Sequence, residues 1–116
     1  MPTNMKKKDT EINIVNENDE IISQEPHGKV HREGLLHREV HVWVYNSNDE
    51  ILFQRRSPNK DTFPGLLDCS AGGHVDLGET YMESALKELA EETGITAAEK
   101  ELFFIKKIKH KGYDKV

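Results

Sequence analysis

Three glutamates in one short segment are the residues of this chain best suited to perform chemistry. Glu88, Glu91 and Glu92 stand at positions i, i+3 and i+4, so a helix would carry all three carboxylates on one face. Like charges at that spacing repel by roughly 0.2–0.5 kcal/mol per pair. A divalent cation would offset the repulsion, because hard cations such as Mg²⁺ are bound through a few carboxylates together with phosphate oxygens and waters. A metal held there would polarise a phosphoryl oxygen and lower the pKa of a bound water.

The segment around these glutamates has the signals of a helix that begins at Thr80. Thr80 and Glu83 form a T-x-x-E capping box, and Gly94 is placed to end the helix in a left-handed conformation. The apolar stripe that would pack on a sheet consists of Met82, Ala85, Leu86 and Leu89. The alternative to a metal site is that the glutamates are an ordinary solvated face opposite this stripe.

The rest of the chain alternates between short strands and turns. The central strand is indicated by strict alternation, with Val40, Val42 and Val44 on one side. The expected elements are a hairpin over 11–24, a connector over 25–34, the central strand over 35–46, a strand over 51–56 that pairs with it, a loop over 57–65, a short buried strand over 66–73 that ends in two glycines, and a strand over 101–110.

The length, net charge and cysteine content of the chain restrict its number of domains, its binding partners and its cellular compartment. A chain of 116 residues has room for one domain, which we place at residues 11–116 after a disordered tail over 1–10. The net charge of −5 gives no broad attraction for nucleic acid or for an anionic membrane surface. The single cysteine, Cys69, provides no disulfide framework and fits a reducing cytoplasm. The sequence contains no signal peptide and no run of about 20 apolar residues that could span a bilayer.

The spacing of residues from Gly73 onward matches a known motif. Gly73 is followed after five residues by Glu79 and, after seven more, by Lys87-Glu88-Leu89-Ala90-Glu91-Glu92-Thr93-Gly94-Ile95. This resembles the Nudix box, G-x5-E-x7-R-E-U-x-E-E-x-G-U, in which U is a bulky apolar residue. Every fixed position matches except Lys87, where the box has arginine. The resemblance implies an α/β fold with a mixed sheet that carries the box helix on one face.

The resemblance also implies a role for each box residue. Glu91 and Glu92 would be the carboxylate ligands of the metal, helped by the carbonyl of Gly72, and Glu88 would be a further ligand or the general base. Glu79 would steady the loop and helix opposite Lys87. A lysine there keeps the charge of the box arginine but loses the planar fork that holds a carboxylate with two hydrogen bonds, so we expect a looser site.

Residues 35–75 narrow the resemblance to isopentenyl-diphosphate isomerases and their hydrolase relatives, and the likeness covers nearly all of residues 11–110. The isomerases have a cysteine where this chain has Gly72, and a glycine cannot perform the proton transfer of isomerisation. The nearly intact box therefore favours hydrolysis. His37 and His74 match two histidines that bind a metal in the isomerases, and we interpret them as substrate or metal contacts; the alternative is ordinary hydrogen-bonded histidines.

Basic residues at the end of the expected strand over 51–56 are candidates for binding a diphosphate. Arg55, Arg56 and Lys60 lie there and in the loop that follows. Arginine binds phosphate oxygens bidentately and lysine as a point charge. Because neighbouring residues of a strand face opposite sides, we expect at most one of the two arginines to face a site.

Taken together, the sequence predicts a Mg²⁺-dependent Nudix hydrolase, with Mn²⁺ able to replace Mg²⁺. Its substrate would be a small molecule with a diphosphate linkage, either a nucleoside diphosphate derivative or a related organic diphosphate. The alternatives are a non-catalytic nucleotide-binding Nudix module and an isoprenoid diphosphate isomerase. Nudix domains continue after the box helix with more strands and a helix, so the C-terminal part of the fold would be missing here or supplied by a second copy in a homodimer.

Overall fold

The computed structural model describes residues 10–59 and 65–109 of the chain. The chain divides into two compact units, the first formed by Met1–Val40 and Gly73–Ser84 and the second by His41–Gly72 and Ala85–Val116. The predicted tail over 1–10 lies outside the described residues except for Thr10, and Lys60 and His110 lie outside them as well. Each unit has an apolar core of its own.

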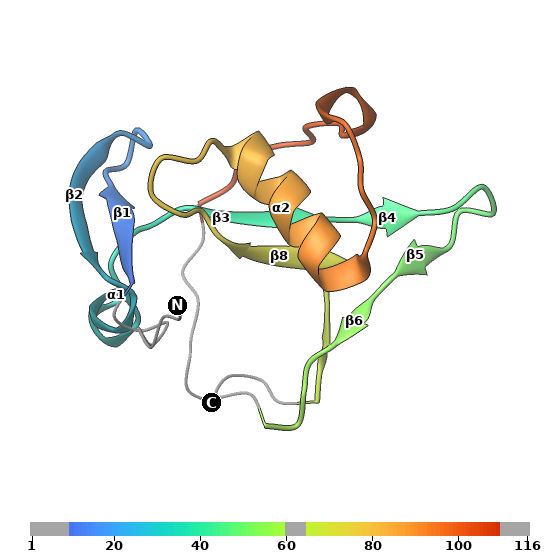
Figure 1. Cartoon of the computed structure of the whole chain (residues 1–116). Helices are drawn as coiled ribbons and strands as arrows, with labels where there is room; N and C mark the ends of the chain where they lie inside the picture. Colours follow the sequence, from blue (N-terminus) through green and yellow to red (C-terminus); the bar gives the residue numbers. More distant parts are fainter. Residues whose placement is uncertain (1–9, 60–64, 110–116) are drawn as a thin grey trace, which may run out of the picture. The chain divides into compact units, whose positions relative to one another are not determined.

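The first unit contains the predicted N-terminal hairpin. Strand β1 (Glu11–Val15) pairs antiparallel with β2 (Ile21–Pro26), which confirms the expected hairpin (Figure 1). Ile12 and Ile14 of β1 are buried against Val30 and form the core of the unit, with Leu35 packed on it. Single bridges join Ile12 to Asp76 and Ile14 to His37.

The segment expected to be a connector is instead a short helix, so the prediction for residues 25–34 was wrong. Helix α1 (His27–Glu33) follows directly after Pro26 and ends at Gly34, which has a left-handed φ of 66°. Proline is tolerated at a helix start because it has no amide hydrogen to lose there, and glycine is the usual residue just past a helix end. Val30 is 1% exposed, so burial of one apolar residue makes the helix part of the core.

The second unit contains a series of short antiparallel pairs. Strand β4 (Val44–Tyr45) pairs with β5 (Ile51–Leu52), and β6 (Gln54–Arg55) pairs with β7 (Leu67–Asp68). The pairing of β4 with β5 confirms the expected hairpin. The strands of the described residues pair two by two, in four two-stranded sheets.

Strands β3 (Glu39–Val42) and β8 (Ala71–His74) pair with each other, and helix α2 (Tyr81–Thr93) packs on them (Figure 1). Val42, Ala71 and Leu89 form the core of the second unit, and Ala85 packs against it. The fold is therefore α/β, and the predicted packing of the glutamate-bearing helix on strands is confirmed. None of the helices in the described ranges is long and apolar enough to cross a membrane.

Two other strand predictions need correction. The two glycines do not end a strand over 66–73, because β8 begins at Ala71 and runs through them to His74, and Leu67 of β7 is exposed. The described residues 101–109 do not form the predicted strand: a 3-10 turn (η2, Glu99–Glu101) is followed by residues 102–109 without regular structure, and Phe103 is 80% exposed. A strand needs a partner for its backbone groups, and no strand of the described ranges pairs with this segment.

Candidate functional site

The glutamates of the motif are carried by a helix whose start is fixed by its own sequence. The amide of Thr80 donates to Glu83 Oε1 at 2.9 Å, and the amide of Glu83 donates to Thr80 Oγ1 at 3.0 Å. Both halves of the predicted capping box are therefore formed. Gly94 has a φ of 79° and its amide donates to the carbonyl of Ala90 at 3.0 Å, which confirms the predicted helix end.

The glutamate that precedes the helix is held by a residue that the sequence analysis did not single out. Ser84 is 0% exposed, and its Oγ donates to Glu79 Oε1 at 2.6 Å. The same oxygen accepts from the amide of Asp76 at 3.3 Å, and the amide of Glu79 donates to the Asp76 carbonyl at 3.1 Å. Glu79 thus closes the turn that leads into α2. The predicted apolar stripe gave no signal for Ser84, which lies on another side of the helix and is buried all the same.

One of the three helix glutamates, Glu92, reaches the backbone of the diglycine segment. Glu92 Oε1 accepts from the amide of Gly72 at 3.4 Å and from Gln54 Nε2 at 2.8 Å. Glu88 is half-buried and forms a side-chain hydrogen bond with Glu92. Partial burial, that hydrogen bond and the charges of Glu92 and Glu91 raise the pKa of Glu88 to about 7. Gln54 also escaped the sequence analysis, because nothing local to β6 relates it to α2.

The carboxylates are close enough for Glu88 and Glu92 to share a proton, and Glu91 is exposed on the same helix. Within residues 10–59 and 65–109, no group of three or more histidine, cysteine, aspartate or glutamate side chains is arranged so that it could hold a metal ion. The recorded contact of Gly72 is made by its amide, whereas the carbonyl was the expected ligand. The oxygens of a carboxylate pair that shares a proton can bind a cation once the proton has left, provided that further ligands complete the site.

The basic residues are engaged within their own hairpin. Arg55 Nη1 donates to the carbonyl of Gly65 at 2.7 Å, and Arg56 Nη1 lies 3.1 Å from Asp68 Oδ2 in an ion pair. A diphosphate would have to compete with Asp68 for Arg56. The assignment of Lys60 to a substrate site stays a prediction, because Lys60 lies outside the described residues.

The histidines of the first unit gather in one place. His37 Nδ1 lies 2.9 Å from the carbonyl of Leu35, and His74 Nε2 lies 3.1 Å from Asp76 Oδ1. The ring of His27 lies 4.4 Å from that of His31 and 4.6 Å from that of His74, and the rings of His31 and His37 are 6.1 Å apart. The analysis of the sequence singled out only His37 and His74, because the i, i+4 spacing of the other two has meaning only if α1 is a helix.

The only thiol of the chain, that of Cys69, is not a candidate for a chemical role. Cys69 is buried and its Sγ donates to the carbonyl of Ala71 at 3.1 Å. Burial, together with the nearby Asp68 carboxylate, raises the pKa of the thiol to about 12. At neutral pH it is therefore a protonated, unreactive group.

Comparison with known proteins decides the family. The model of the NUDIX domain matches residues 35–114. The chain belongs to the Nudix family. Members of this family act on small molecules and generally use divalent metal ions.

Similar proteins span a wide range of lengths. The chain is 46% identical over 71 residues to Nudix hydrolase 3 of Arabidopsis thaliana, a match that covers 60% of this chain and 9% of that protein. It is 41% identical over 96 residues to the uncharacterised Nudix hydrolase YfcD of Salmonella typhi, covering 80% of this chain and 52% of the relative. The crystal structure of DR0079 from Deinococcus radiodurans matches with a TM-score of 0.67 and 36% identity, covering 74% of this Nudix chain and 53% of that one.

The chain thus spans about half the length of YfcD and of the DR0079 chain. The names of these relatives do not point to the isopentenyl-diphosphate isomerase branch, so that finer placement of this Nudix domain stays a prediction.

Proposed function

We propose that this chain is the catalytic domain of a Mg²⁺-dependent hydrolase that opens a diphosphate linkage in a nucleoside diphosphate derivative or a related organic diphosphate. The observation that carries the proposal is the contact of Glu92 with the backbone amide of Gly72, with Glu88 hydrogen-bonded to Glu92 on a helix that also bears Glu91. The family generally uses divalent ions, and carboxylate oxygens are the ligands that such ions prefer.

The carboxylates of Glu88, Glu91 and Glu92 are the ligand type that a hard divalent cation prefers, and binding would require them to move closer together than they lie here. Glu91 and Glu92 would hold it, with the backbone at Gly72 nearby, and Mn²⁺ would replace Mg²⁺ because both prefer oxygen ligands. The bound metal would supply a polarised phosphoryl oxygen and a water of lowered pKa.

The side chains around that metal have distinct tasks. Glu88 is a further ligand or accepts the proton of the attacking water. Its pKa of about 7 in the metal-free protein suits proton transfer near neutral pH, although a bound cation would lower it. Gln54 orients the Glu92 carboxylate through its hydrogen bond. Glu79 steadies the turn before the helix, and Lys87 stands in for the arginine of the box.

The phosphate groups of a substrate are bound by positively charged side chains and by hydrogen-bond donors. We assign this task to Arg55, Arg56 and Lys60, with His37 and His74 as further contacts. Arg56 already pairs with a carboxylate, so phosphate binding there would exchange Asp68 for a stronger partner.

Location and assembly are part of the same proposal. A single buried cysteine fits the reducing cytoplasm. A homodimer in solution would appear in sedimentation as twice the mass of the chain.

The experiment that tests the activity is a substrate screen with Mg²⁺, using nucleoside diphosphate derivatives, dinucleotides and isoprenoid diphosphates. We expect release of phosphate, pyrophosphate or two phosphorylated products from one of these classes, and loss of that release with a chelator. Proton exchange at carbon in an isoprenoid diphosphate, without phosphate release, would instead identify an isomerase. Calorimetric binding of a nucleotide without turnover would identify a non-catalytic module.

A further inference from the structure

Two turns of the chain have the same sequence pattern and the same geometry. Asn16–Glu20 (NENDE) joins β1 to β2, and Asn46–Glu50 (NSNDE) joins β4 to β5. In each turn the asparagine Oδ1 accepts from the amides two and four residues later, at 2.9 and 3.0 Å. In each, the aspartate has a left-handed φ of 62°. Each turn therefore closes its own hairpin with the same local hydrogen bonds.

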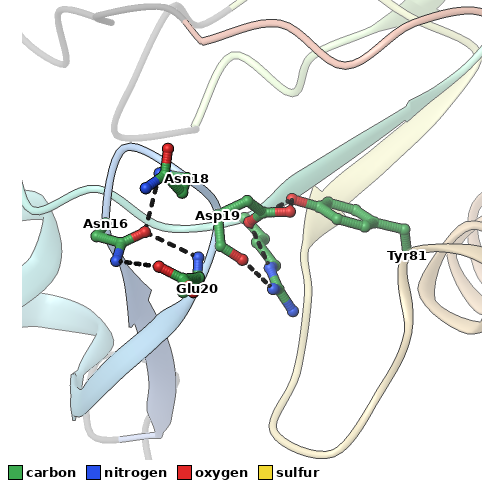
Figure 2. A network of polar contacts seen from close by, with 6 residues as sticks. Asn16, Asn18, Asp19, Glu20 and Tyr81 are labelled. Carbon is green, nitrogen blue, oxygen red and sulfur yellow. Dashed lines mark hydrogen bonds and ion pairs between the residues drawn. The ribbon is translucent and has the colours of Figure 1, made fainter.

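The two turns differ in what their aspartate contacts. Arg38 Nε donates to Asp19 Oδ1 at 2.7 Å, and Arg38 Nη2 donates to the Asp19 carbonyl, also at 2.7 Å. The hydroxyl of Tyr81 lies 3.0 Å from both carboxylate oxygens of Asp19 (Figure 2). Asp49, the equivalent residue of the second turn, is exposed.

The Asp19 contacts are partly buried and reinforce one another. The side chains of Arg38 and Asp19 are 19% and 18% exposed. The guanidinium carbon of Arg38 lies 5.2 Å from the centre of the Tyr81 ring. Hydrogen bonds between ionised groups are roughly twice as strong as neutral ones, and shielding from water strengthens them further. Asp19, Arg38 and Tyr81 all belong to the first compact unit.

Tyr81 makes this contact significant, because it is the first residue of α2. The cap residue Thr80 and the turn residue Glu79 come directly before it, and Glu88, Glu91 and Glu92 follow along the same continuous helix. Asp19 lies outside residues 35–114, the part that matches the family model. Nothing in the Nudix box itself therefore assigns it a role.

We propose that Asp19 and Tyr81 are positioning residues for the glutamate-bearing helix: through these contacts the turn of the N-terminal hairpin forms a clamp on the first turn of α2, which holds in place a helix start that the local capping bonds have already formed. The consequence for catalysis rests on the proposed function above. The clamp itself rests only on the contacts of Asp19.

The repeated turn provides a matched control. Asp19→Asn and Asp49→Asn make the same chemical change at the same φ, and asparagine tolerates the left-handed conformation as well as aspartate does. Both variants keep the turn, but only Asp19→Asn removes the charge that faces Arg38 and Tyr81. We expect Asp19→Asn to lower kcat about 10-fold with KM changed less than about 2-fold, since displaced catalytic groups can cost up to about 100-fold in rate. Asp49→Asn should leave kcat and KM at the wild-type values.

A second variant tests whether the pair acts as a unit. Tyr81→Phe removes one hydroxyl and keeps the ring under Arg38. In a double-mutant cycle we expect the fall in kcat of Asp19→Asn/Tyr81→Phe to be smaller than the product of the two single effects, because both variants break the same contact. If Asp19→Asn reduces the yield of folded protein, Tyr81→Phe carries the test alone, with Asp49→Asn still as control.

A measurement without substrate separates the clamp from the proposed activity. The amide of Ser84 donates to the carbonyl of Thr80 at 3.0 Å in the first turn of α2, and its hydrogen exchange reports on that turn. With a chelator present, we expect this amide to exchange faster in Asp19→Asn than in Asp49→Asn. In a separate titration, we expect Asp19→Asn to bind Mn²⁺ more weakly than Asp49→Asn does.

The outcomes are distinct. If the wild-type protein cleaves no diphosphate but Asp19→Asn still exchanges faster and binds Mn²⁺ more weakly, the clamp stands and the proposed hydrolysis falls. If Asp19→Asn and Asp49→Asn exchange alike, the clamp is overturned. Loss of thermal stability in Asp19→Asn with kcat and Mn²⁺ affinity both at the wild-type values would also overturn the positioning role.

Discussion

At the scale of single residues, Glu88 has the most unusual chemistry among the proposed ligands. It lies partly buried, and its carboxyl group forms a hydrogen bond with that of Glu92. Two adjacent carboxylates cannot both ionise at low cost, so one of them keeps its proton to higher pH. A cation bound to this face would replace that proton as the group that neutralises the pair.

The raised pKa of Glu88 gives a test by pH. Its pKa is about 7 in the folded protein and 4.5 in an unperturbed glutamate. Between these values the folded state holds a proton that the unfolded chain has released, so the contribution of Glu88 to the free energy of unfolding falls as pH rises from about 4.5 to 7. In urea unfolding with a chelator present, the wild type should therefore lose more stability between pH 5 and pH 8 than Glu88→Gln. Equal losses in the two proteins would contradict a raised pKa.

The proposed metal-binding role of the exposed Glu91 and Glu92 can be tested by replacing each with glutamine, which removes the charge and keeps the shape of the side chain. We expect Glu91→Gln and Glu92→Gln each to lower kcat by about 100-fold or more, since the loss of preorganised electrostatic stabilisation is worth about 3–4 kcal/mol in known sites. The folded state should survive, because both side chains are on the surface. Glu99→Gln, the same change on the exposed 3-10 turn, is the control. Wild-type rates of both variants at saturating Mg²⁺ would remove this face from the metal site.

At the scale of elements, α2 depends on its first turn. Thr80 and Glu83 satisfy each other's amides at its start, Glu79 accepts from the amide of Asp76 in the turn before it, and the Ser84 hydroxyl donates to Glu79. These hydrogen bonds are local, with partners three to five residues apart, so the beginning of the helix follows from its own sequence.

The capping hydroxyl can be removed while the rest of α2 is kept. Thr80→Ala leaves the amide of Glu83 without its side-chain acceptor and should lower the free energy of unfolding by about 1 kcal/mol. Thr80→Ser retains the hydroxyl and should stay within about 0.5 kcal/mol of the wild type, because serine caps as well as threonine. Urea unfolding midpoints measure both. A loss as large in Thr80→Ser would mean that the methyl group of Thr80, and not its hydroxyl, stabilises the helix start.

At the scale of the whole molecule, residues 10–34, which precede the family match, contribute a buried core. Ile12, Ile14 and Val30 form a buried core, and Leu35, the first residue of the match, packs on it. A Nudix domain cut at residue 35 would expose this contact surface to water.

Shortening the chain tests that dependence. A chain that begins at Leu35 should fail to show a cooperative unfolding transition, because it lacks the whole buried cluster of β1 and α1. A chain that begins at Thr10 keeps every described residue of that cluster and should unfold at the wild-type midpoint. Thermal unfolding followed by circular dichroism compares the two. A cooperative transition in the shorter chain would show that residues 35–116 fold without the hairpin.

The sequence by itself determined the elements whose signals are local. The capping box at Thr80, the stop at Gly94 and the hairpin turns at 16–20 and 46–50 appear where their residues predicted them, since turns and caps are satisfied within a few residues. The family followed from the same segment, because the spacing of the Nudix box is written along one helix and the loop before it.

Only the tertiary structure decided the partners of the charged groups. Gln54 reaches Glu92 across 38 residues of sequence, and Asp19 reaches Tyr81 across 62. The same dependence on distant neighbours explains two of the three corrected predictions: α1 forms because Val30 is buried against Ile12 and Ile14 of β1, and residues 102–109 form no strand because no strand of the described residues pairs with them. Local patterns fix what a segment can become, whereas packing between distant segments fixes what its side chains meet.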